Sequence, residues 1–249
     1  MNRWSEAAES LVRGDAEIAA LAALAETADT RDFLTAVLGG RYAGRTALVT
    51  SFGAESAILL HMVAGIDRGA PVIFLETGKL FPETLAYRDL LIERLGLGDV
   101  RSVKPDWGAL LAADPAGDLW RRDPDSCCRL RKVEPLERAL QGFAVWINGR
   151  KRYQTEERSR LPLAERVEGR IKLNPLAHWS AEDVERYFAE HRLPRHPLEV
   201  RGYRSIGCEP CTTPTSSDED ARAGRWRGSE KTECGIHFDG NRIVRSQSA

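Results

Sequence analysis

Short apolar runs alternate with longer helical stretches through the chain, and this alternation limits the fold more than any other feature. The runs predict strands at five places: 46–50, 71–75, 100–103, 144–147 and 171–174. Helices are predicted around and between them, over 4–28, 30–40, 57–64, 82–95 and 180–191. Strands that alternate with helices in this way predict an α/β fold, with a parallel sheet and helices on both faces.

The length of 249 residues fits one large domain with appendages. We expect an N-terminal helical segment over 1–44 and an α/β domain over 45–195. After Pro194 the sequence becomes irregular and rich in Gly, Pro, Thr and Arg. We therefore expect a C-terminal segment over 196–249 without regular structure.

Charge and hydropathy exclude two classes of partner. The formal net charge is −1, so no general attraction to nucleic acid or to a membrane surface is expected. No run of about 18 apolar residues exists, so we expect no membrane-spanning helix. The first residues, Met1 to Glu6, lack the apolar core of a signal peptide, which predicts a cytoplasmic protein.

All five cysteines lie after residue 126. An odd number does not match a disulfide framework, and such clustering in a reducing compartment indicates metal or thiol chemistry. Cys127 and Cys128 are adjacent, and the pair Cys208 and Cys211 follows much later. Four thiolates can ligate zinc or an iron–sulfur cluster. Adjacent cysteines are unusual for zinc and favour a cluster; the remaining alternative is a set of unligated buried cysteines.

The fifth cysteine, Cys234, is left over from this set. Lys231 lies three residues before it and His237 three residues after it. Nearby positive charge favours the thiolate, which is the nucleophilic form of cysteine. A segment that contains glycine would let this thiol move to a bound substrate. The alternative is an incidental cysteine in a C-terminal tail.

Two loops follow predicted strands. The small-residue turn Ser51-Phe52-Gly53-Ala54-Glu55-Ser56 precedes a helix, where backbone N–H groups and the helix dipole favour a phosphate or a sulfate. The turn Leu75-Glu76-Thr77-Gly78 lies at the carboxyl end of the second strand, where ligands of open α/β sheets bind. The alternatives are an ordinary strand–helix turn and a tight loop in which Pro82 starts the next helix.

The basic residues form three groups beside these motifs. Arginine suits the bidentate capture of phosphate or sulfate, so the groups predict an anionic ligand. The alternatives are a solvated surface and an RNA site, although the groups lack the interleaved aromatic residues of an RNA site. The groups are Arg129, Arg131 and Lys132; Arg150, Lys151, Arg152, Arg158 and Arg160; and Arg222, Arg225, Arg227 and Lys231.

Taken in order, these motifs resemble those of the assimilatory sulfonucleotide reductases, specifically the adenylyl-sulfate branch. The resemblance implies an adenine-nucleotide α-hydrolase-like, Rossmann-like fold. It also implies thioredoxin-dependent reduction of adenylyl sulfate to sulfite and AMP, in sulfate assimilation and cysteine biosynthesis. The motifs that carry it are residues 51–56, 75–78 with 81–84, 127–128, 146–162, 208–211 and 231–237.

The resemblance also implies a mechanism. Cys234 would attack the sulfate sulfur, AMP would leave, and thioredoxin, a separate protein, would reduce the S-sulfocysteine. A four-iron four-sulfur cluster that passes no electrons to the substrate would bind to Cys127, Cys128, Cys208 and Cys211. Substrate contacts are expected at Ser51, Gly53, Leu75, Thr77, Lys132, Gly149, Arg158, Arg222, Arg225 and His237. A homo-oligomer is left open.

The sequence departs from the family pattern at three positions. Glu76 stands where the family commonly has an aspartate. Tyr153 and Thr155 replace a usual acidic residue and a usual serine in the arginine-rich loop. The contacts of this loop therefore cannot be carried over from the family.

The sequence leaves four alternative functions open. Reductases restricted to phosphoadenylyl sulfate typically lack the four cluster cysteines, although some enzymes that carry them accept both substrates. A tRNA-thiolating enzyme would need ATP, and its loop would normally read Ser-Gly-Gly-x-Asp-Ser, where this chain has Phe52 and Glu55. A non-enzymatic alternative is a zinc-stabilised nucleotide-binding module, which would contain zinc in place of iron and sulfide.

Overall fold

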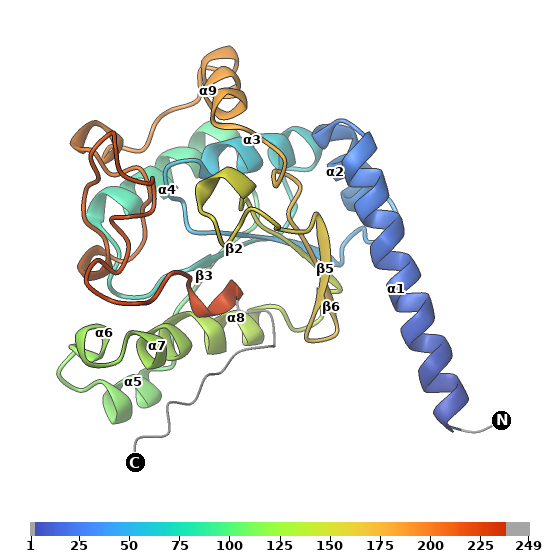
Figure 1. Ribbon diagram of the computed structural model, residues 1–249, viewed down its shortest axis with the longest axis horizontal. Coiled ribbons are helices and arrows are strands. Elements are labelled where there is room, and N and C mark those ends of the chain that lie inside the picture. The colour runs from blue at the N-terminus through green and yellow to red at the C-terminus, as the bar shows by residue number, and fades with distance from the viewer. Residues whose placement is uncertain (1–2, 238–249) are drawn as a thin grey trace.

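The computed structural model describes residues 3–237, and the side chains of residues 14–236. Its centre is a six-stranded sheet in the order β3-β2-β1-β4-β6-β5 (Figure 1). Neighbouring strands are parallel except β5, which pairs antiparallel with β6. The strands are β1 (Thr46–Thr50), β2 (Val72–Leu75), β3 (Val100–Val103), β4 (Val145–Ile147), β5 (Ala164–Val167) and β6 (Arg170–Leu173).

The five predicted strands are confirmed, but the edge strand β5 was missed. Glu165 and Arg166 interrupt its apolar pattern, so it does not read as a buried strand. A tight turn at Glu168 and Gly169 joins it to β6, with positive φ at both residues (50° and 79°). Such a turn matches the twist of a two-stranded hairpin and sets the antiparallel pairing.

The predicted helices are also confirmed, and four short helices between β3 and β4 were missed. The long ones are α1 (Arg3–Thr27), α2 (Thr30–Gly39), α3 (Ser56–Ile66), α4 (Pro82–Leu95) and α9 (Ala181–Glu190). The missed ones are α5 (Trp107–Ala113), α6 (Leu119–Arg122), α7 (Pro124–Cys128) and α8 (Glu134–Ala139), with a π-helical turn over Arg129–Val133. None of the helices in the described part of the chain is both long and apolar enough to cross a membrane.

Helices cover both faces of the sheet, as predicted. Successive strand residues point to opposite faces, so Leu48 packs in the larger core with α2, α3, α4 and α9, while Val49 packs against α8. Figure 1 shows α3 and α4 on one side of the sheet and α5–α8 on the other. Along the edge strand β5, the Arg166 guanidinium donates to the carbonyl of Gly14 in α1 at 3.2 Å.

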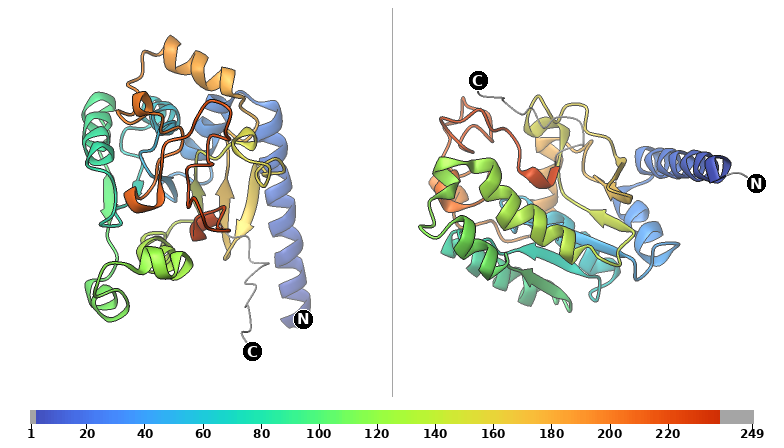
Figure 2. Two further views of the ribbon diagram at one scale, coloured as in Figure 1. Left: turned by 60° about the vertical axis from the view of Figure 1, so that its left-hand side comes forward. Right: turned by 90° about the horizontal axis from the view of Figure 1, so that it is seen from below.

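After α9 the chain returns to the carboxyl edge of the sheet, and up to residue 237 it forms no further strand. Short 3₁₀ turns occupy Glu199–Arg201, Glu209–Cys211 and Gly235–His237. Leu198 and Ile206 pack against Ala54 and Phe81, and Trp226 packs against Cys128 of α7. Figure 2 shows this orange-to-red segment beside the green helices. It therefore brings residues late in the sequence to the loops that follow β1 and β2.

Candidate active site

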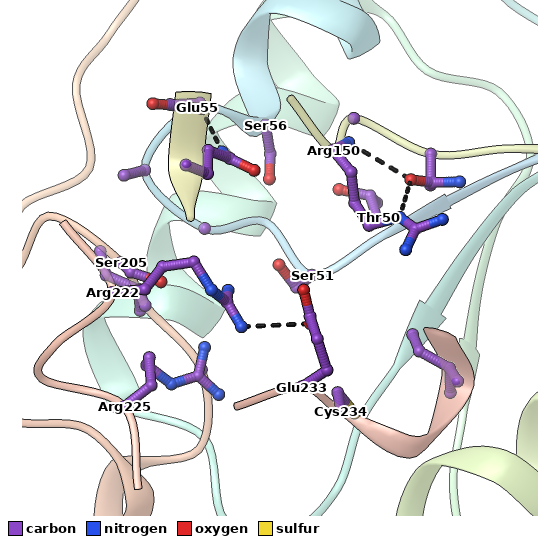
Figure 3. A pocket seen from close by; sticks show the side chains of 18 of the residues that line it. Thr50, Ser51, Glu55, Ser56, Arg150, Ser205, Arg222, Arg225, Glu233 and Cys234 are labelled. Atoms are coloured by element: carbon purple, nitrogen blue, oxygen red, sulfur yellow. Dashed lines mark hydrogen bonds and ion pairs between the residues drawn. The ribbon is translucent and has the colours of Figure 1, made fainter. Parts of the chain in front are cut away.

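A pocket opens where β1, β2 and β4 end, at the edge where ligands of open α/β sheets bind. Its wall combines the loop after β1, the start of the arginine-rich loop after β4, and the C-terminal segment (Figure 3). It brings together most of the predicted substrate residues and the predicted nucleophile, namely Ser51, Gly53, Leu75, Lys132, Gly149, Arg158, Arg222, Arg225 and Cys234.

Two predicted contacts are placed differently. Thr77 is absent from the described residues that line the pocket, and its hydroxyl lies 3.3 Å from the sulfur of Cys208. His237 lies in the last 3₁₀ turn, but its side chain is outside the described residues. The role of both residues toward a substrate stays a prediction.

The loop after β1 makes a tight turn before the N-terminus of α3. Phe52 is fully buried and has a φ of 48°, and its amide donates to the hydroxyl of Thr50 at 3.1 Å. A Cβ on Gly53 would lie 3.2 Å from the carbonyl oxygen of Ile206, so this position suits glycine. The turn leads directly into α3, whose N-terminus favours a negative charge.

Glu55 joins the loop after β1 to the arginine-rich loop, a connection that the sequence did not predict. Its carboxylate accepts from Lys151 Nζ at 2.7 Å, from Gln154 at 2.8 Å and from the Tyr153 hydroxyl. Burial alone would raise the pKa of Glu55, but the buried Lys151 ammonium and these hydrogen bonds hold it below its usual value. Tyr153, which departs from the family pattern, is thus a partner of Glu55.

Three arginines line one side of the pocket. Arg158 and Arg222 share the carboxylate of Glu233, and Arg225 lies over the ring of Trp226 at 4.5 Å. Gly207, which the sequence did not single out, lies against Arg225, and a Cβ there would overlap the guanidinium group. This group of cations makes the pocket suitable for a phosphate or a sulfate.

Cys234 lies at the base of this pocket and is buried, packed with Cys128 and Trp226. A hydrogen bond from the Cys128 thiol lowers the pKa of Cys234, and the Lys132 ammonium lowers it further, against the opposing effect of burial. Burial would also lower the pKa of Lys132, but the sulfurs of Cys208, Cys234 and Cys128 raise it. The Lys132 ammonium therefore favours the thiolate of Cys234, which is the nucleophilic form of cysteine.

The remaining cysteines line a second cavity, beside the first, together with Lys132 and Trp226. None of them forms a disulfide. Among the described side chains, no three of His, Cys, Asp or Glu lie close enough to share one metal ion. Cysteine thiolates are the ligands of iron–sulfur clusters, and the predicted cluster stays a prediction. The residues that could hold it are Cys127, Cys128, Cys208 and Cys211.

The chain is similar to several known proteins. Residues 45–214 match the family model of the phosphoadenosine phosphosulfate reductase domain. A Mesorhizobium japonicum protein named adenosine 5′-phosphosulfate reductase is 54% identical over 78% of this chain and 76% of its own length. One of that name from Streptomyces coelicolor is 41% identical over 74% and 78%. A crystal structure of phosphoadenylyl-sulfate reductase from Candida auris aligns with a TM-score of 0.65 and 26% identity, covering 78% of this chain and 96% of the other.

Proposed function

The chain belongs to the phosphoadenosine phosphosulfate reductase domain family, and on that premise we propose that it reduces adenylyl sulfate to sulfite and AMP in sulfate assimilation. The two relatives named for this reaction support the substrate. The observation that carries the mechanism is the position of Cys234, a buried thiol in the same pocket as Arg158, Arg222 and the loop after β1.

Substrate binding uses the charge distribution of the pocket. The phosphate lies at the loop after β1, where Ser51, Gly53 and the N-terminus of α3 supply donors. Leu75, at the end of β2, and Gly149, shortly after β4, border the nucleoside. The arginines bind the phosphosulfate from the other side, and Lys132, beside Cys234, binds its sulfate end. Adenylyl sulfate carries two joined anionic groups, which matches a pocket with donors on two sides.

The first chemical step transfers the sulfonate group to the enzyme. The Cys234 thiolate attacks the sulfate sulfur, and the bond between that sulfur and the phosphate oxygen breaks. The bonding electrons leave with AMP, whose phosphate charge the arginines stabilise. Cys234 then carries an S-sulfonate, and no electrons have yet been supplied from outside.

A dithiol reductant completes the cycle, and thioredoxin supplies this chemistry. One thioredoxin thiolate attacks the Cys234 sulfur, and sulfite leaves with the electron pair of the S–S bond. The second thioredoxin thiol then releases Cys234 from the mixed disulfide. Two electrons pass from thioredoxin to sulfite, and thioredoxin becomes a disulfide. The five free thiols fit the reducing cytoplasm, where we propose that the enzyme works.

Cys127, Cys128, Cys208 and Cys211 would hold a four-iron four-sulfur cluster. When bound, the cluster supplies a fixed charge beside Lys132 and ties α7 to the C-terminal segment. The chain's own residues carry the other tasks. The charge of Lys132 acts on the ligand cysteines and on Cys234 alike, and Cys234 stays outside the ligand set as the reacting thiol.

Sulfite release by anaerobically purified protein tests the proposal. With thioredoxin present, we expect adenylyl sulfate to be used at least about tenfold better than its 3′-phosphorylated form. Without a reductant, AMP release should stop at about one equivalent per enzyme, because Cys234 stays sulfonated. Equal use of both compounds would overturn the assigned substrate, and iron-loaded protein that uses neither would overturn the function.

A further inference from the structure

The arginines of the pocket already bind an anionic side chain of the same protein, the carboxylate of Glu233. Glu233 reaches in from the C-terminal segment toward Arg222 (Figure 3). Arg158 donates to both carboxylate oxygens of Glu233, at 2.8 Å to Oε2. Arg222 donates to the same Oε2 at 3.2 Å. The carboxylate therefore bridges two guanidinium groups.

This arrangement is the one that arginines adopt around a bound phosphate or sulfate. Two parallel N–H groups of Arg158 face two oxygens, as in a bidentate oxyanion complex. The pair is not a surface ion pair, because the side chains of Arg158, Arg222 and Glu233 are only 7%, 12% and 15% exposed. Glu233 thus occupies the donor groups that a phosphosulfate would need.

Glu55 and Arg150, two further charged residues that line the pocket, have partners of their own. Glu55 is the second acidic residue among those that line it, and it binds Lys151. Arg150 donates to Glu165 at 2.9 Å. Glu233 is therefore the acidic lining residue that faces Arg158 and Arg222.

These two arginines need a counter-ion even when no substrate is bound. Burial, together with the charges of Arg158 and Arg225, lowers the pKa of Arg222 to about 9. Burial would raise the pKa of Glu233, but the hydrogen bond from Arg158 and the charge of Arg222 hold it below its usual value. A charged carboxylate in this place stabilises cations that have lost much of their contact with water.

We propose that Glu233 is an intramolecular competitor for the anionic group of the substrate. It binds Arg158 and Arg222 in the empty enzyme, leaves them when the phosphosulfate binds, and returns as AMP departs. The inference rests on the proposed function, because it assigns these arginines to the substrate anion. Glu233 directly precedes Cys234, so the exchange couples the occupancy of the site to the position of the nucleophile.

The affinity for AMP, measured by calorimetry on the full-length protein, tests this competition. An internal ligand that occupies the site about nine-tenths of the time weakens the apparent affinity about tenfold. The substitution Glu233→Gln should therefore tighten AMP binding about tenfold. Glu233→Asp, whose shorter carboxylate cannot bridge both arginines, should give a smaller gain.

Glu230→Gln is the matched control, because Glu230 lies on the same segment, is exposed and loses the same charge. It should leave AMP affinity within about twofold of wild type, since exposed charges are screened. An equal gain in both variants would assign the effect to general electrostatics and overturn the competition. Unchanged or weaker binding to Glu233→Gln would overturn it as well. Failure of AMP to bind any of these proteins would overturn the proposed function along with it.

Hydrogen exchange of residues 229–236 gives a second readout, independent of affinity. In wild type, AMP should speed exchange in this segment several-fold, because it releases Glu233 from the arginines. In Glu233→Gln, exchange should already be fast and should not respond to AMP. If AMP slows exchange in wild type, Glu233 stays in place during binding and the competition is overturned.

Discussion

The reactivity of Cys234 depends on residues that lie far from it in the sequence. Cys128 of α7 packs against it, and Lys132, one turn later in the π-helical turn, lowers the pKa of Cys234. Both belong to the segment that carries the first cysteine pair. The thiol is thus activated by the same segment that would bind the cluster. Its reactivity and the integrity of that segment are therefore linked.

Replacing the thiol by a hydroxyl should separate chemistry from binding. In Cys234→Ser we expect sulfite formation to fall at least about 10³-fold, because a serine hydroxyl is not ionised at neutral pH. AMP affinity should stay within about twofold of wild type. A sulfite assay and calorimetry on the same preparation check both results. Substantial turnover by this variant would show that another residue is the nucleophile.

At the scale of elements, a histidine joins α4 to the start of the C-terminal segment. His196 is fully buried; its Nε2 lies 3.1 Å from the Thr84 hydroxyl, and its Nδ1 accepts from the Leu198 amide at 3.1 Å. Tyr87 of α4 adds a hydrogen bond to the carbonyl of Pro194 at 2.7 Å. These contacts fix the direction in which the chain leaves α9 and approaches the pocket.

The buried imidazole predicts a pH dependence of stability. Burial lowers the pKa of His196 to about 4. An unfolded histidine has a pKa of about 6.5, so between these values the unfolded state binds a proton that the folded state does not. Stability is therefore lost as the pH falls through this window, by about 2 kcal/mol between pH 7.5 and pH 5.

Urea unfolding at both pH values measures this loss. The variant His196→Gln should be less stable at pH 7.5 but should lack the part of the loss that His196 causes. His178 is exposed, and His178→Gln serves as the control that should keep the wild-type pH dependence. An equal loss in wild type and in His196→Gln would show that His196 does not set the response.

At the scale of the whole molecule, the two cysteine pairs connect parts of the chain that meet only after folding. Cys127 and Cys128 end a short helix that Asp123 caps, accepting from the Ser126 amide at 3.0 Å. Cys208 pairs with Leu80 in a β-bridge after β2. A cluster between the two pairs would therefore link α7, the loop after β2 and the C-terminal segment.

Loss of one proposed ligand should release this link. In Cys211→Ser we expect the bound iron to be lost and the free energy of unfolding to fall by about 3 kcal/mol or more, because metal binding contributes directly to folding. Iron analysis and thermal unfolding measure the two effects. Cys234→Ser is the matched control and should keep its iron. Full iron content in Cys211→Ser would exclude Cys211 as a ligand.

Local patterns in the sequence determined the elements and the chemistry that they carry. Short-range features, such as apolar periodicity and the residues that start a helix, predicted five strands and the long helices. The turn over 51–56 and the cysteine pairs are short-range features themselves. The capping box at Ser180 and Asp183, which starts α9, is one such feature. Because each signal spans only a few residues, it can be read without knowing the fold.

Only the tertiary structure decided which of these groups act on one another. Lys151 and Glu55 are 96 residues apart, and Arg158 and Glu233 are 75 residues apart. The edge strand β5 and the short helices α5–α8 could not be predicted either, because which of their residues are apolar depends on the elements that pack against them. No periodicity connects residues at such distances, and their contacts arise when the C-terminal segment packs on the carboxyl edge of the sheet. A candidate nucleophile could thus be named from the sequence, whereas the carboxylate that binds Arg158 and Arg222 beside it could not.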